Sequence, residues 1–288
     1  MRIYLERQVE RRNPFGSVSR ACLSAGWSDC VGHLVEFAQD LHGVYRKGAG
    51  GLEVRSRAPE GIVARIRSRG TCLYCTREVA RSAMARHLAA CESRRRVLAE
   101  RDSATGREAS LLHLQVRDSW TGEYWLHLEI DCSASLGVLD SYLRAIWLEC
   151  CGHASQFSVG GWRGPEIPMS RKVHQVFRAG VELTHIYDFG SEAVTLINAV
   201  SHRTGKPTTR RPIALMARNI APVIECQECG SAAAFLCEEC RIENDEPGAL
   251  CATHGATHPH EEYGELIPIV NSPRVGMCGY TGPAEAPY

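Results

Sequence analysis

The chain has 288 residues, of which 44% are hydrophobic and 23% charged, the composition of a globular protein with one ordinary domain and small satellites. No run of 18 or more apolar residues occurs, and residues 1–12 lack the apolar core of a signal peptide, so we expect neither a membrane span nor secretion. Fourteen cysteines without an export signal indicate reduced thiols on metal in a cytoplasmic protein.

Two oppositely charged segments lie behind the net charge of zero. Residues 55–107 contain 13 arginines, no lysine and five acidic residues, whereas residues 225–288 contain two arginines and 11 acidic residues. Such segments are not expected to share a partner, although they can also contact each other.

Residues 1–60 carry no motif, and we expect them to be a loosely ordered extension. Within it, Val31–His42 has the apolar spacing of a short amphipathic helix, and residues 47–51, rich in glycine, are typical of a linker.

Residues 62–101 have the ligand spacing of a C2HC zinc finger, with Cys72, Cys75, His87 and Cys91 as ligands. The absence of Gly and Pro predicts a helix over residues 83–101 with Ser82 as its N-cap, so that His87 and Cys91 lie one turn apart on one face. Zinc would supply about 10 kcal/mol of folding free energy to so small a module.

The predicted finger helix and its surroundings are rich in arginine, which suits phosphate contacts and guanine recognition. A single finger offers little area for sequence-specific binding, however, so protein docking and a purely structural role stay open. The candidate nucleic-acid-binding residues are Arg77, Arg81, Arg86, Arg94, Arg95 and Arg96.

Residues 108–205 predict an α+β domain, in which an antiparallel sheet packs against one helix. The helix begins at Ser135 and runs to about Glu149 with an apolar stripe. The predicted strands are 110–116, 123–130, 157–162, 183–189 and 193–200. Residues 206–224, rich in Pro and Arg, are predicted to be a linker.

Cys150, Cys151 and His153 raise the question of a thiol nucleophile with its base, but a helix C-terminus raises a thiol pKa, so we favour packing. The remaining isolated cysteines have no partner at ligand spacing and are interpreted as small hydrophobes. These are Cys22, Cys30, Cys132 and Cys278. His113, His127 and His185 fall on predicted strands, where cross-strand packing is the expected role.

Residues 225–283 are rich in cysteine and histidine, and we expect them to form a zinc module. One arrangement is a simple ribbon with Cys226, Cys229, Cys237 and Cys240 on one ion. The other is an interleaved, B-box-like pattern, in which Cys226, Cys229, Cys251 and His254 hold one ion and Cys237, Cys240, His258 and His260 a second. The chain would then bind three zinc ions, or two if the module is a ribbon. Its acidic character favours a protein partner and repels nucleic acid.

Several stretches also carry a family resemblance: 124–129 (YWLHLE), 146–153 (IWLECCGH), 186–191 (IYDFGS), 268–274 (PIVNSPR) and 278–282 (CGYTG). Together, over roughly residues 65–283, they resemble a prokaryotic plasmid-borne family first named from the third open reading frame of an Ri plasmid. Its domain also bears the label of a resolvase-like passenger of an insertion element. A serine recombinase needs an activated Ser among several Arg, a cluster that the middle domain lacks, so recombination is not expected.

These expectations combine into a zinc-binding, non-enzymatic protein that associates with DNA or other nucleic acid through its arginine-rich finger and binds protein through its acidic module. The alternative is a protein-interaction adaptor with purely structural zinc sites. An enzyme would need a pocket in the middle domain lined by convergent polar groups.

Overall fold

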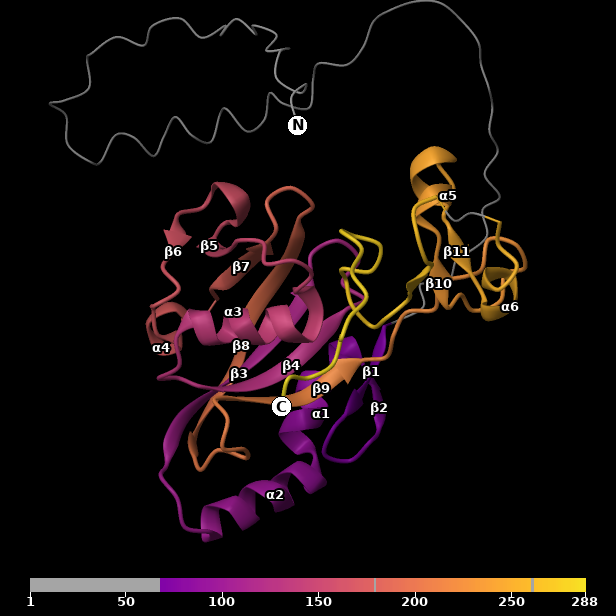
Figure 1. Ribbon diagram of the computed structural model, residues 1–288. Coiled ribbons are helices and arrows are strands. Elements are labelled where there is room, and N and C mark those ends of the chain that lie inside the picture. The colour runs from indigo at the N-terminus through magenta and orange to yellow at the C-terminus, as the bar shows by residue number, and fades with distance from the viewer. Residues whose placement is uncertain (1–67, 179, 260–261) are drawn as a thin grey trace, which may run out of the picture. The chain divides into compact units, whose positions relative to one another are not determined.

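The structure, a computed structural model, describes residues 68–178, 180–259 and 262–288. The extension 1–60, with its expected helix Val31–His42 and linker 47–51, therefore lies outside the described residues. The described chain contains one large and one small sheet, with helices on both faces of the large one (Figure 1).

The large sheet has nine strands, all paired antiparallel, in the order β2-β1-β9-β4-β3-β8-β7-β5-β6. The alternation of apolar residues that predicted β3 and β4 is the pattern of strands with distinct faces. The strands are β1 (Arg69–Cys72), β2 (Glu78–Ala80), β3 (Ala109–Asp118), β4 (Trp125–Asp131), β5 (Ser155–Val159), β6 (Glu166–Ile167), β7 (Glu182–Tyr187), β8 (Ala193–Gly205) and β9 (Ile213–Asn219). The predicted antiparallel sheet is confirmed.

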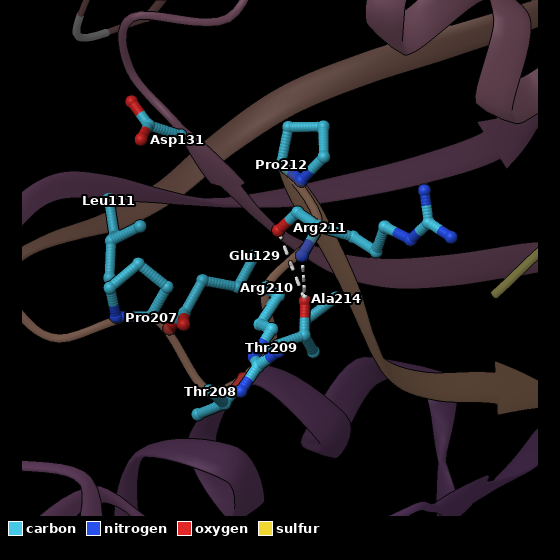
Figure 2. A pocket seen from close by; sticks show the side chains of 10 residues that line it. All are labelled: Leu111, Glu129, Asp131, Pro207, Thr208, Thr209, Arg210, Arg211, Pro212 and Ala214. Atoms are coloured by element: carbon cyan, nitrogen blue, oxygen red, sulfur yellow. Dashed lines mark hydrogen bonds between the residues drawn. The ribbon is translucent and has the colours of Figure 1, made fainter. Parts of the chain in front are cut away.

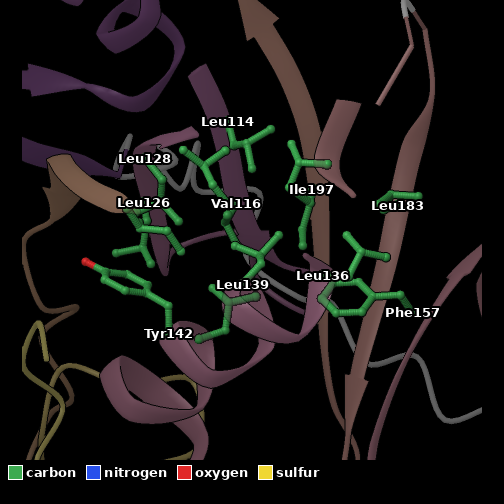
Figure 3. Close-up of a cluster of buried hydrophobic side chains, with 14 of the residues drawn as sticks. Leu114, Val116, Leu126, Leu128, Leu136, Leu139, Tyr142, Phe157, Leu183 and Ile197 are labelled. Atoms are coloured by element: carbon green, nitrogen blue, oxygen red, sulfur yellow. The ribbon is translucent and has the colours of Figure 1, made fainter. Parts of the chain in front are cut away.

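One face of this sheet packs against helix α3 (Leu136–Leu143) and the π-helix η2 (Arg144–Leu148) that continues it. Leu114 and Val116 of β3 point toward Leu136 and Leu139 of α3, and all four side chains are fully buried (Figure 3). The predicted helix 135–149 is confirmed, with Ser135 at the N-cap position but no capping hydrogen bond from its side chain. The short helices η3 (Gly161–Arg163) and α4 (Val173–Val176) complete this region.

The opposite face is covered by the predicted finger. Helix α1 (Arg81–Ala90) buries Met84 and Leu88 against Trp125 of β4 and Met216 of β9. Strand β1 pairs with β9, so the finger hairpin extends the large sheet. The finger is thus continuous with the central sheet through strand pairing and a shared apolar cluster.

The single helix expected over residues 83–101 is two helices in the structure. Helix α1 begins after Ala80, not at Ser82, and α2 (Glu92–Ser103) follows a break at Cys91, whose backbone is extended (φ −66°, ψ 116°). The prediction of one helical face for His87 and Cys91 is therefore wrong. The Cys91 thiol, at the break, still lies in one group with Cys72, Cys75 and His87.

Residues 206–224, expected to be a linker, contain strand β9, which lies between β1 and β4 in the sheet. The C-terminal module then folds around a three-stranded sheet of β10 (Phe235–Leu236), β11 (Ala249–Leu250) and β12 (Ile267–Pro268). Two short helices, α5 (Glu238–Glu243) and α6 (Ala252–Gly255), accompany it.

Candidate metal centres

Among the residues that the structure describes, four groups of Cys and His side chains converge, each with its ligand atoms within 4.8 Å of one another. Tetrahedral zinc, with bonds of about 2.3 Å to sulfur and 2.0 Å to nitrogen, keeps two sulfurs about 3.8 Å apart and sulfur and nitrogen about 3.5 Å apart. A disulfide would instead bring two sulfurs to about 2.05 Å.

The first group is Cys72, Cys75, His87 and Cys91, the four ligands predicted for the finger. Cys72 ends β1, and a tight turn in which Thr76 has a positive φ of 58° returns Cys75 toward it. Cys75 Sγ lies 3.3 Å from His87 Nε2, close to a tetrahedral edge. The residues present therefore fit a tetrahedral ion.

Burial raises the pKa of the Cys72 thiol to about 11, which disfavours its thiolate in the absence of a cation. The pKa of Cys75 is lowered: burial raises it, but hydrogen bonds from the Arg77 backbone and from Cys72 and Cys91 outweigh that effect. A coordinated metal deprotonates a thiol outright. Metal binding would thus convert the whole group to ligands.

The second group is Cys226, Cys229, Cys251 and His254. The sulfurs of Cys229 and Cys251 are 3.9 Å apart, and His254 Nδ1 is 3.3 Å from Cys251 Sγ and 3.5 Å from Cys226 Sγ. Burial raises the pKa of Cys226, but hydrogen bonds from the backbone N–H groups of Cys251, Glu228 and Cys229 outweigh that effect and bring the pKa down to about 6. This lowering favours the thiolate, the form of cysteine that binds metal.

The third group is Cys237, Cys240 and His258, with 3.3 Å between Cys240 Sγ and His258 Nε2. His260 lies outside the described residues, so the predicted fourth ligand stays a prediction. The two Cys-x2-Cys pairs fall in different groups. This is the interleaved arrangement; the ribbon would have required both pairs in one group.

The fourth group, Cys150, Cys151, His153 and Cys278, was not expected as a metal site. Cys151 Sγ lies 3.7 Å from Cys150 Sγ, 3.5 Å from Cys278 Sγ and 2.9 Å from His153 Nε2. The interpretation of Cys278 as a cysteine without partners is therefore wrong. Adjacent cysteines and a thiol more than 120 positions away give no ligand spacing, so the sequence held no signal for this convergence.

The six arginines predicted to contact nucleic acid have different environments. Arg77, Arg86, Arg95 and Arg96 are exposed. Arg81 instead donates to the carbonyl of Gly122. Arg94 is largely buried, with its guanidinium 3.3 Å from the carboxylate of Glu129 on β4.

The strand histidines pack as expected. His113 Nε2 and His127 Nδ1 are 2.7 Å apart between β3 and β4, on the face toward the finger. His185, fully buried on β7, lies 2.8 Å from the carboxylate of Asp140. Neither pair belongs to a described metal group.

A pocket of about 240 Å³ lies beneath the loop between β8 and β9 (Figure 2). It is lined by Glu129 and Asp131 of β4 and by Arg210 and Arg211 of the loop, among others. Glu129 already accepts two hydrogen bonds from Arg203, and Asp131 accepts from the backbone and hydroxyl of Ser133. These carboxylates are engaged in holding the fold and its turns.

Among the described residues, no helix is both long and apolar enough to cross a membrane.

No protein-family model matches the chain, and no curated protein matches it. Among solved structures it is similar to a protein of unknown function, MM3350, from Methanosarcina mazei Go1. That similarity has 15% identity and a TM-score of 0.32, and it covers 36% of this chain and 66% of the other. The chain therefore spans just under two thirds of the length of that structure.

Proposed function

We propose that the chain is a zinc-binding, non-enzymatic protein that associates with nucleic acid through the arginines around its first metal group, while its acidic C-terminal module binds protein. The observation that carries the proposal is the set of exposed guanidinium groups on the finger, at Arg77, Arg86, Arg95 and Arg96. Their partners are weak: Arg95 and Arg96 lie 3.6 and 3.9 Å from the exposed Glu92, and such surface pairs yield readily to phosphate.

The basic surface extends beyond the finger. Arg101 of α2 donates to the carbonyl of Thr208 at 2.9 Å, which sets the β8–β9 loop against the helix. The same loop presents exposed Arg210 and Arg211. Arginines along α2 and this loop would bind the phosphate backbone of a nucleic acid with little sequence preference, because phosphate contacts carry no base information.

The proposed protein partner rests on a second surface. In the C-terminal module, Ile242 of α5 is 59% exposed, and Tyr263, whose hydroxyl donates to Glu243, is 42% exposed. Glu243, Asp245 and Glu262 are exposed as well. Exposed apolar side chains in an acidic module suit a basic, amphipathic segment of another protein. This feature also favours the second candidate function, an adaptor whose modules all bind protein.

The test is binding of the full chain to a fluorescent DNA duplex and to a single-stranded RNA over a range of salt. For the double variant Arg95→Ala/Arg96→Ala we expect weaker binding and a salt slope smaller by about two counterions, roughly one per lost phosphate contact. The matched control is Arg163→Ala/Arg171→Ala, which removes two exposed arginines near β6. Equal losses in both variants, or no salt-dependent binding by the wild-type chain, would favour the adaptor.

A further inference from the structure

We propose that Cys150, Cys151, His153 and Cys278 bind a structural zinc ion that fastens the C-terminal tail, residues 271–288, to the central domain. The donor set, three thiolates and one imidazole, is one that zinc uses in closed four-coordinate sites. Three of the separations, 3.7, 3.5 and 3.4 Å, lie close to tetrahedral edges. The 2.9 Å between Cys151 Sγ and His153 Nε2 is shorter, and ion binding would widen it by roughly half an ångström.

The central domain presents its three ligands through the π-helix. Glu149 N–H reaches back five residues to the Arg144 carbonyl at 2.8 Å, and this wide turn ends the helix immediately before Cys150. Glu149 is then held by Arg144 at 2.6 Å and accepts from Gly152 N–H at 2.6 Å. The loop carrying Cys150, Cys151 and His153 is thus shaped before any ion arrives, a preorganisation that favours binding.

The tail brings the fourth ligand by an anchored path. Arg274 is fully buried and pairs with Asp188, which follows β7. Ser272 donates to the Trp147 carbonyl at 2.6 Å, so the tail is pinned to the end of the π-helix itself. Four residues beyond Arg274, Cys278 has a left-handed backbone (φ 51°), which is unfavourable for a non-glycine residue. A metal bond at its sulfur would offset that cost.

The surroundings suit a thiolate-rich ion. Arg274 Nη2 donates to Cys150 Sγ at 3.5 Å, the kind of outer contact that orients a ligand and balances its charge. Its position 5.1 Å over the Tyr187 ring holds the guanidinium there. Four donors around one point leave no open coordination position, so the ion would be structural.

The experiment is native mass spectrometry of the full chain, with each variant compared with wild type. Cys278→Ser is expected to bind one zinc ion fewer than wild type, whereas Cys278→His, which restores a donor, is expected to keep the wild-type count. The thiol-matched control is Cys132→Ser, because Cys132 is buried in the core and belongs to none of the metal groups. Equal zinc content in wild type and Cys278→Ser, or a wild-type mass two hydrogens lighter from a disulfide, would overturn the proposal.

A second measurement needs only the wild-type chain and covers the case in which Cys278→Ser misfolds. Cys151 and Cys278 are exposed, so without an ion both thiols are accessible to iodoacetamide. We expect both to be protected in the native, zinc-replete chain and to react once a chelator is added. Fast alkylation of both before chelation would refute the site. Failure here is separable from failure of the proposed function, because the other three groups contribute their own ions to the total.

Discussion

Glu129 is a buried carboxylate that gives the neighbouring arginines Arg94 and Arg203 a structural role. Its side chain is only 4% exposed, and it receives Arg203 of β8 at 2.6 and 2.8 Å and Arg94 of α2 at 3.3 Å. A buried charge left without partners is strongly destabilising, so these guanidinium groups are needed inside the protein. Arg94 therefore fastens the finger to the sheet, and the exposed Arg95 and Arg96 are the better candidates for phosphate contact.

The buried pair His113 and His127 makes a pH prediction at the same scale. Burial lowers the pKa of His113 to about 3, helped by His127 and Arg94, and burial lowers that of His127 to about 4. Each histidine takes up a proton near pH 6.5 in the unfolded chain, but only at about pH 3–4 in the folded protein. Between those limits the free energy of unfolding should fall with decreasing pH, by up to about 1.4 kcal/mol per pH unit for each histidine.

Denaturant unfolding at a series of pH values measures this slope in wild type, His127→Gln and the exposed control His202→Gln. Acid would also protonate the candidate metal ligands in all three proteins, so the informative quantity is the difference in slope. His127→Gln should have a shallower slope between pH 6 and 4, and His202→Gln should match wild type. Identical slopes in all three would mean that the pair is protonated in the folded state.

At the scale of elements, β1 joins the finger to the sheet by pairing with β9, and the close approach of the two strands requires a glycine at position 70. A Cβ at Gly70 would meet the carbonyl of Arg218 on β9 and the ring of Trp125 well inside contact distance. Gly70→Ala should therefore push β1 away from β9 and lower the free energy of unfolding by roughly 1–3 kcal/mol, the usual cost of overpacking. At Gly137, in the first turn of α3, a Cβ finds its nearest neighbour at 3.5 Å, an ordinary contact.

Denaturant unfolding of Gly70→Ala beside Gly137→Ala checks this prediction. The Gly137 variant should stay within about 0.5 kcal/mol of wild type or gain slightly, because alanine restricts the unfolded chain. Equal stability of the Gly70 variant and wild type would indicate that β1 does not press against β9.

The helices and strands also show which features the local sequence pattern can predict. The sequence of 110–116 and 123–130 predicted β3 and β4, because alternation over a long strand records both of its faces. Strand β9 was not predicted because its residues follow a stretch rich in Pro and Arg, and because nothing in the local sequence shows that it lies between β1 and β4. The helix break at Cys91 was not predicted because residues 83–101 contain no Gly or Pro, so nothing local marks an interruption there.

At the scale of the whole molecule, the same distinction separates the metal groups. Cys-x2-Cys pairs place two sulfurs on one turn, so the spacing alone predicted the ligands at Cys72 and Cys75 and at the first two pairs of the C-terminal module. The meeting of Cys278 with Cys150 and Cys151 depends on the docking of the tail through Arg274, a tertiary event that spacing does not encode.

Removal of metal tests how the parts depend on it. The central sheet buries a large apolar cluster against α3, whereas the small C-terminal sheet buries two small clusters, one of Leu236, Ala249 and Ile267 and one of Leu250 with Cys237 and Cys240. Structural zinc contributes on the order of 10–16 kcal/mol in small modules. We therefore expect a strong chelator to unfold residues 225–268 and to leave β3, β4 and β8 folded.

Hydrogen exchange read by mass spectrometry, before and after chelation, provides the measurement. Peptides covering β10, β11 and β12 should lose protection, those covering β3, β4 and β8 should keep it, and added zinc should restore the original pattern. The finger should lie between these extremes, because Met84 and Leu88 retain their packing on Trp125 without an ion. Simultaneous loss of protection in both sheets would instead mean that the central sheet also depends on metal. The proposed zinc ion at Cys278 would then be the first candidate for that dependence.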